Sequence, residues 1–162
     1  METYTVKVYE YRTVWYNENG KVHRTDGPAI EWSDGNKSWY LNGLLHRTDG
    51  PAIERTDGRK EWLLNGKLHR TDGPAKEYTN GAKDWYLNGL LHRTDGPAIE
   101  FDNYKEWFLN GKLHRTDGPA VECADGYKQW YLNGEQLTQS EFESRMKPCK
   151  GKKVIEIGRA HV

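Results

Sequence analysis

His46-Arg47-Thr48-Asp49-Gly50-Pro51-Ala52 is one of five identical copies of a seven-residue segment in this chain. Successive copies lie 23, 23, 23 and 22 residues apart. They begin at His23, His46, His69, His92 and His114. A period of this length indicates a structure built by stacking one small unit, because no single unit can bury its apolar side chains alone. The sequence therefore predicts a tandem array.

Each unit is divided by three glycine turns. The unit that spans residues 39–61 reads WYLNGLLHRTDGPAIERTDGRKE, with turns at Asn42-Gly43, Asp49-Gly50 and Asp57-Gly58. Such pairs supply the positive φ angles that tight hairpin turns require. The segments between them are too short for helices and are rich in aromatic or β-branched residues, which predicts strand, turn and strand.

The clearest predicted hairpin joins Pro28–Trp32 to Lys37–Leu41. The other four are Pro51–Arg55 with Lys60–Leu64, Pro74–Tyr78 with Lys83–Leu87, Pro97–Phe101 with Lys105–Leu109, and Pro119–Cys123 with Lys128–Leu132. In the fourth hairpin the turn at 102–104 is one residue shorter, which accounts for the 22-residue spacing. A loop tolerates this change better than a strand does.

The Trp-bearing strands alternate between two sets of side chains. Trp39 and Leu41 share one face, and Tyr40 points to the other. We expect the Trp/Leu face to be the better packed, because burying one such ring removes about 150–250 Å² from water. The side chains expected on the opposite face are Tyr40, Leu63, Tyr86, Phe108 and Tyr131.

The seven-residue segment has two alternative interpretations. Aligned His, Arg and Asp side chains suggest a metal ladder or a catalytic row, whereas Thr-Asp-Gly-Pro is a turn signature. In the second interpretation Arg pairs with an Asp one repeat away and His stacks between rings. A catalytic site needs different residue types that meet in one pocket, and a zinc ion needs ligands that converge on one point. A row of identical residues supplies neither. We therefore favour the second interpretation, in which the segment is a turn that connects one repeat to the next. We predict no catalytic residue, cofactor or metal.

Composition narrows the classes of partner. The chain has 24 basic and 24 acidic residues in interleaved order, so neither nucleic acid nor a membrane surface is expected as a partner. The 20 aromatic residues suit a thin sheet with aromatic ladders. The chain has two cysteines, which suits a reduced, cytosolic protein. Its first residues lack the basic and apolar segments of a signal peptide, so we expect a cytoplasmic location.

The ends differ from the array. Residues 1–14 predict one or two capping strands, 15–134 the repeat array, and 135–148 a capping helix. The helix is expected over Gln139–Lys147, with Thr138 and Glu141 forming a capping box. A disordered tail is expected at 149–162. Residues 157–162 resemble the translation of a short-read sequencing adapter, which suggests that they are not native.

The pattern Trp-x-x-Asn-Gly-x-x-His-Arg-x-Asp-Gly-Pro, followed by Asp-Gly-x-Lys-x-Trp, resembles the MORN repeat and its variant in bacterial antitoxin-like proteins. The match covers residues 15–134. Similar arrays occur in phage and large-virus proteins. The resemblance implies an elongated antiparallel sheet, with two strands per unit, that acts as a scaffold for proteins or lipids. This chain has His-Arg-x-Asp-Gly-Pro in place of the Gly-x-Gly of MORN units, which argues against lipid binding.

The predicted fold is all-β: an elongated single-layer antiparallel meander or solenoid of five to six 23-residue hairpin repeats, with a short C-terminal capping helix. The expected function is a non-enzymatic protein-binding module, antitoxin-like or counter-defence and encoded by a phage or virus. The alternative is a structural component of a virion. The predicted interaction surface consists of Tyr40, Tyr86, Phe108, Tyr131, His46, Arg47, His69, Arg70, His92 and Arg93.

Overall fold

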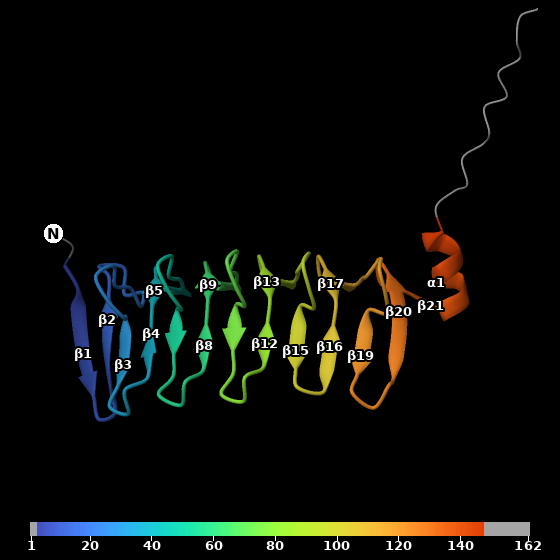
Figure 1. Cartoon of the computed structure of the whole chain (residues 1–162). Coiled ribbons are helices and arrows are strands. Elements are labelled where there is room, and N and C mark those ends of the chain that lie inside the picture. Colours follow the sequence, from blue (N-terminus) through green and yellow to red (C-terminus); the bar gives the residue numbers. More distant parts are fainter. Residues whose placement is uncertain (1–2, 148–162) are drawn as a thin grey trace, which may run out of the picture.

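The computed structural model of the chain describes residues 3–147. The predicted tail at 149–162, the adapter-like residues 157–162 and the last residue of the predicted 135–148 segment lie outside the described residues. The structure is an elongated row of repeats with one helix at the C-terminal end (Figure 1).

Thirteen antiparallel strands form one open sheet, in the order β1-β2-β3-β4-β7-β8-β11-β12-β15-β16-β19-β20-β21. Their bounds are β1 Thr5–Tyr9, β2 Arg12–Tyr16, β3 Ile30–Trp32, β4 Lys37–Ser38, β7 Ile53–Glu54, β8 Lys60–Glu61, β11 Lys76–Glu77, β12 Lys83–Asp84, β15 Ile99–Phe101, β16 Tyr104–Glu106, β19 Val121–Cys123, β20 Lys128–Leu132 and β21 Glu135–Leu137. The sheet is a meander that does not close on itself, which confirms the predicted all-β single-layer fold.

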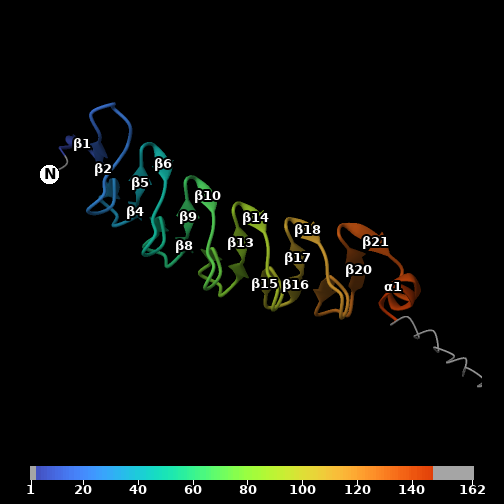
Figure 2. The same cartoon turned by 90° about the horizontal axis from the view of Figure 1, so that it is seen from above.

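Four short hairpins leave the plane of this sheet. They are β5 Tyr40–Leu41 with β6 Leu44–Leu45, β9 Leu63–Leu64 with β10 Lys67–Leu68, β13 Tyr86–Leu87 with β14 Leu90–Leu91, and β17 Phe108–Leu109 with β18 Lys112–Leu113. Figure 2 shows them lengthwise while the strands of the main sheet are seen nearly end-on, so each repeat is L-shaped in cross-section. Their turns are tight because both Asn42 (φ 52°) and Gly43 (φ 89°) are left-handed.

The bend lies at the Trp of each repeat. The predicted strand Lys37–Leu41 is observed as β4 and β5, with Trp39 between them. The Trp39 amide donates to the carbonyl of Ala52, and its own carbonyl accepts from the amide of His46. Residues 47–51 loop out between these two pairings, so the strand changes partner at Trp39 and turns out of the plane.

One predicted turn is wrong in its conformation. Gly58 has a φ of 97°, as a tight Asp-Gly hairpin turn requires. Gly50 of Asp49-Gly50 has no positive φ. The Asp49-Gly50 pair therefore belongs to the looped-out segment, and its glycine is needed for a different reason, given below.

The two faces of the sheet share the core. We name them by their repeated ring: the Trp face carries Trp39 and its equivalents, and the Tyr face carries the residues at the position of Tyr40. On the Trp face, Trp39, Trp62, Trp85 and Trp107 each lie between alanines of two neighbouring strands. These alanines are 0% exposed: Ala29, Ala52, Ala75, Ala98 and Ala120. The Trp rings themselves are half-buried.

The Tyr face also contributes buried residues, namely Val14, Ile30, Ser38, Leu63, Asp84 and Val121. We expected the Trp/Leu face to be the better packed of the two, and the structure has buried residues on both faces. Residues on the Tyr face are buried at the bend, because the two arms of the L bring their side chains together there.

The C-terminal end is covered by helix α1 (Gln139–Met146). Its capping box is the predicted one, with Thr138 Oγ1 accepting from the Glu141 amide and Glu141 Oε2 accepting from the Thr138 amide. Phe142 is buried, and Arg145 makes two 2.8 Å contacts with the carboxylate of Glu135 in β21. Within residues 3–147, no helix is long and apolar enough to cross a membrane.

Candidate functional site

The looped-out segment places an Arg over the Trp of its own repeat. The guanidinium carbon of Arg47 lies 4.0 Å from the centroid of the Trp39 ring. The same stacking occurs five times, at 4.3, 4.0, 4.0, 3.9 and 3.9 Å, for Arg24 on Trp15, Arg47 on Trp39, Arg70 on Trp62, Arg93 on Trp85 and Arg115 on Trp107. A cation over an aromatic face is attractive by about 0.5–2 kcal/mol.

Acidic groups and a carbonyl hold each guanidinium in place. Arg47 Nε lies 2.9 Å from Asp49 Oδ1, while its Nη1 donates to Pro51 O (3.2 Å) and to Glu54 Oε1 (2.8 Å). The pair therefore lies within one repeat, and the expectation that Arg pairs with Asp one repeat away is wrong. The hydrogen bond from Arg47 holds the pKa of Asp49 below its ordinary value.

The glycine of the segment makes room for this guanidinium. A Cβ atom on Gly50 would lie 2.8 Å from Arg47 Cζ, closer than real Cβ contacts. The corresponding distances at Gly27, Gly73, Gly96 and Gly118 are 2.9, 2.9, 2.8 and 3.1 Å. Glycine here leaves room for the end of the Arg side chain, which a Cβ would displace, whereas Gly43 and Gly58 adopt a backbone conformation that favours glycine.

The histidine of the segment fastens one repeat to the next. His46 Nδ1 accepts the backbone N–H of Asn65, 19 residues on, at 3.1 Å. The other four contacts measure 3.0, 3.2, 3.2 and 3.0 Å and join His23 to Asn42, His69 to Asn88, His92 to Asn110 and His114 to Asn133. Each histidine therefore bonds to the neighbouring Asn-Gly turn, and one of them, His23, also has an aromatic ring beside it, that of Tyr4 at 6.2 Å between centroids.

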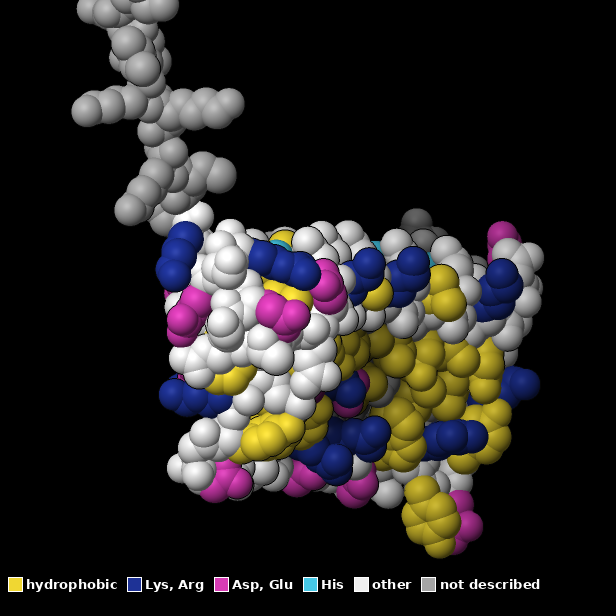
Figure 3. All heavy atoms as spheres, turned by 90° about the vertical axis from the view of Figure 1, so that its right-hand side faces the viewer, with side chains coloured by type: hydrophobic (Ala, Val, Ile, Leu, Met, Phe, Trp, Pro, Cys, Tyr) yellow, Lys and Arg dark blue, Asp and Glu magenta, His cyan; other side chains and the backbone are white. Residues whose placement is uncertain are grey.

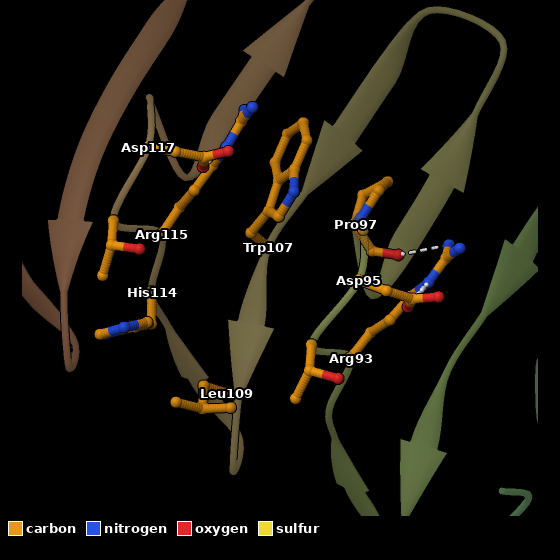
Figure 4. Close-up of a pocket in the computed structure, with 11 residues that line it drawn as sticks. Arg93, Asp95, Pro97, Trp107, Leu109, His114, Arg115 and Asp117 are labelled. Atoms are coloured by element: carbon orange, nitrogen blue, oxygen red, sulfur yellow. Dashed lines mark hydrogen bonds and ion pairs between the residues drawn. The ribbon is translucent and has the colours of Figure 1, made fainter.

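Four equivalent grooves lie between successive looped-out segments, with volumes of about 460–610 Å³. In the groove shown in Figure 4, Trp107 stands between the segment of Arg93 and Pro97 and the segment of Arg115 and Asp117. Every groove presents the same residue types, and its Arg and Asp are already paired with each other. Among residues 3–147, no group of three His, Cys, Asp or Glu is arranged to hold a metal ion.

In the main sheet the Trp face is the same from repeat to repeat, whereas one position on the Trp side of the hairpins varies (Leu44, Lys67, Leu90 and Lys112). Besides the seven-residue segment, six positions of each regular repeat keep the same residue type: Trp39, Leu41, Asn42, Gly43, Glu54 and Lys60 and their equivalents do not vary. The side chains that hold the repeats together are therefore a constant framework.

The Tyr face, in contrast, differs in every repeat. Four positions vary along the array. Their residues, from the first hairpin to the fifth, are Ile30, Ile53, Lys76, Ile99 and Val121; Trp32, Arg55, Tyr78, Phe101 and Cys123; Ser38, Glu61, Asp84, Glu106 and Gln129; and Tyr40, Leu63, Tyr86, Phe108 and Tyr131. Figure 3 shows a broad hydrophobic area that runs along the array beneath the layer of hairpins, interrupted by a few charges.

The middle repeats give the Tyr face an acidic character. Asp84 is 6% exposed, accepts the Tyr78 hydroxyl at 2.7 Å, and has one carboxylate oxygen without a hydrogen-bond partner among the described residues. Burial raises the pKa of Asp84, and burial together with the hydrogen bond to Asp84 raises the pKa of Tyr78. Lys76 lies 3.9 Å from Glu61, and the second to fourth hairpins place three carboxylates (Glu61, Asp84 and Glu106) and two cations (Arg55 and Lys76) on this face.

The ten residues of the predicted interaction surface do not form one surface. Tyr40, Tyr86, Phe108 and Tyr131 are half-buried on the Tyr face. The paired residues His46, Arg47, His69, Arg70, His92 and Arg93 lie on the opposite face and are engaged by Trp, Asp and Asn. The predicted surface does not include the variable positions of the hairpin strands, such as Tyr78 and Asp84. Their departure from the repeat is the signal that could have identified them.

Comparison of the sequence with family models and with curated proteins finds no match.

Proposed function

We propose that this chain is a non-enzymatic protein-binding module that contacts its partner through the Tyr face. The observation that carries the proposal is the contrast between a constant Trp face and a varied Tyr face. Recognition of one particular partner needs unlike side chains at defined places, whereas an identical row fits only a periodic ligand. Aromatic side chains, which are common anchors in protein interfaces, recur along the Tyr face.

The partner in this proposal presents apolar side chains and at least one Lys or Arg. Aromatic and aliphatic residues flank the acidic middle of the face, where the carboxylates Glu61, Asp84 and Glu106 outnumber the cations Arg55 and Lys76. A carboxylate that lacks a donor in an apolar setting gains a strong interaction from an incoming cation. Glu61, whose side chain is 34% exposed, is the carboxylate that such a cation can reach, because the unpartnered oxygen of Asp84 is buried.

The absence of an enzymatic role is part of the proposal. Arg, Asp, Glu and His of the repeated segment are engaged in contacts that hold the array, and the grooves beside them repeat one set of residues. The resemblance to MORN-type scaffolds fits the same role. On that resemblance, we propose a phage or viral origin, a location in the host cytoplasm, and a host protein as the partner.

The test uses a variant in which the third hairpin takes the Tyr-face residues of the first: Lys76→Ile, Tyr78→Trp and Asp84→Ser. Each residue introduced already occurs at the equivalent position, at Ile30, Trp32 and Ser38. A matched control, Leu90→Ala, removes an exposed apolar side chain from the Trp side of hairpin β13–β14.

Both variants and the natural chain are immobilised and exposed to lysate of a bacterial host, and bound proteins are identified by mass spectrometry. We expect one protein to be retained by the natural chain and by Leu90→Ala and to be lost with the triple variant. Equal retention by the triple variant would contradict the assignment of the Tyr face.

A further inference from the structure

The two ends of the sheet are finished differently. At the C-terminal end, α1 follows β21 and packs on β20 and β21 (Figure 1). At the N-terminal end, β1 is the first strand in the order and pairs on one side only, with β2. All five residues of β1 are exposed. An edge strand with free backbone groups is a template for pairing with another strand.

The free backbone groups of β1 belong to two valines. Trp15 directs its amide and carbonyl toward Ala29 and His23, away from β1, so its partner Val6 forms a non-hydrogen-bonded pair with it. Because the pairs alternate along an antiparallel ladder, Val6 and Val8 point their N–H and C=O groups outward. The side chains of Val6 and Val8 are 48% and 79% exposed, on the same face.

The single charge within β1 does not block this edge. Lys7 Nζ lies 5.1 Å from the centroid of the Tyr16 ring in β2, so the ammonium is held over its own sheet. A lysine that projected past the edge would oppose strand addition. Here the edge presents two valines and their backbone groups, which suit a second apolar strand.

We infer that two copies of the chain pair through antiparallel β1 strands, with Val6 opposite Val6 of the second copy. A twofold axis normal to the sheet relates the copies, since this symmetry makes neighbouring strands antiparallel. At the C-terminal end α1 packs on β20 and β21, so the inferred assembly joins the two β1 ends and closes as a dimer instead of growing into a filament. Within the residues described, this distinguishes the dimer from an end-to-end polymer.

Charges select the register. Val6 opposite Val8 would place Lys7 against Lys7 of the second copy, and like charges directly opposite are destabilising. Val8 opposite Val8 would place Lys7 against Tyr9, whose ring already has the Arg12 guanidinium 5.2 Å from its centroid. With Val6 opposite Val6, Lys7 faces Thr5 of the other copy, and the apolar valine side chains meet on one face.

The dimer has a consequence that is independent of the proposed function. An axis normal to the sheet keeps equivalent faces on the same side, so the two 13-stranded sheets become continuous and both Tyr faces point the same way. A contact limited to two five-residue strands is small beside the about 1,200–2,000 Å² of stable complexes. The dimer should therefore dissociate on dilution.

The first test is sedimentation equilibrium of the purified full chain over a wide concentration range. The mass should rise from that of the 18.8 kDa chain to twice this value and stop there. Val6→Pro removes an outward N–H in each copy but no β1–β2 hydrogen bond, and should weaken the dimer at least about tenfold. Tyr11→Ser, in the adjacent turn and outside the strand, should leave the dimer unchanged.

A second test fixes the register in a chain carrying Cys123→Ser and Cys149→Ser. Val6→Cys should form a disulfide-linked dimer, because Cα atoms of such a pair are about 5.5 Å apart. Val8→Cys should not, since Val8 would lie about 13 Å from its counterpart. A chain that remains monomeric, a mass that keeps growing, or cross-linking by Val8→Cys alone would overturn the inference.

Discussion

The Trp face and the Tyr face come from the same strands, yet they are built on opposite rules. On the Trp face, every repeat uses the same Trp, Arg, Asp and Glu, and the Arg of each repeat is paired with its Asp and its Glu. On the Tyr face, the side chains change from repeat to repeat, and Asp84 keeps an unpaired oxygen. Residues that are the same in every repeat make the contacts that hold the array together. Residues that differ between repeats lie where a particular partner could be recognised.

The largest expected effect is a difference in stability between substitutions at two adjacent residues, Trp85 on the Trp face and Tyr86 on the Tyr face. Trp85→Ala should lower the free energy of unfolding by about 3–5 kcal/mol, because it removes a large ring and the support of the Arg93 guanidinium. Tyr86→Leu should change it by less than about 1.5 kcal/mol, since Leu63 occupies the equivalent position naturally. Urea unfolding measures both, and an equal loss would remove the distinction between the faces.

The next effect concerns a glycine that serves the Trp face. Gly73→Ala places a Cβ 2.9 Å from Arg70 Cζ and should cost about 1–3 kcal/mol by displacing the guanidinium from Trp62. In a chain that already carries Arg70→Ala, the same change should cost clearly less, because the clash is gone. A double-mutant cycle by chemical unfolding tests this coupling. Additive losses would mean that Gly73 is needed for another reason.

A smaller effect is expected from the contact between repeats. His69→Ala leaves the backbone N–H of Asn88 without its acceptor and should cost about 1–2 kcal/mol. The exposed Thr71, in the same looped-out segment, offers a control, and Thr71→Ala should be nearly neutral. Thermal unfolding of the two variants measures the difference. If His69→Ala melts at the same temperature as the natural chain, the histidine does not fasten the repeats.

The smallest effect is a dependence on pH with opposite signs on the two faces. Hydrogen bonds from Arg47 and Arg70 lower the pKa of Asp49 and Asp72, so their stabilisation is present above an unfolded pKa of about 3.9 and is lost as pH falls through the folded values. Burial raises the pKa of Asp84, so its destabilisation at neutral pH disappears on acidification.

The measurement is the melting temperature between neutral pH and pH 3 for the natural chain and for Asp84→Asn, which keeps an acceptor for Tyr78. The variant should be more stable at neutral pH and should lose this advantage as the solution is acidified. A variant that is less stable at neutral pH would contradict the account of Asp84.

The sequence predicts much of the fold because the repeat carries local signals. The Asn42-Gly43 turn, the hairpin of β3 and β4 and the capping box at Thr138 all depend on residues close together in the chain. The bend at Trp39 and the bond from His46 to Asn65 could not be predicted, since both depend on register between segments up to 19 residues apart. The conformation of Gly50 was predicted wrongly, because a glycine that makes room for a side chain and a glycine that adopts a positive φ look the same in a sequence.

The candidate site was harder to predict for a related reason. A frequent segment attracts attention, and its His and Arg side chains resemble binding residues until their partners are known. Asp84 and Tyr78 occur once each at positions where other repeats differ, so only the strand register reveals that they meet. A search for the most frequent motif overlooks the positions that vary between repeats and the face of the sheet on which they lie.

The most direct test of the division between faces is urea unfolding of the triple variant Lys76→Ile, Tyr78→Trp and Asp84→Ser. The account predicts that this chain is at least as stable as the natural one, because each residue introduced already occurs at the equivalent position of the first hairpin. A loss of more than about 2 kcal/mol, beyond the range of most neutral substitutions, would show that the variable residues hold the fold and would contradict the account.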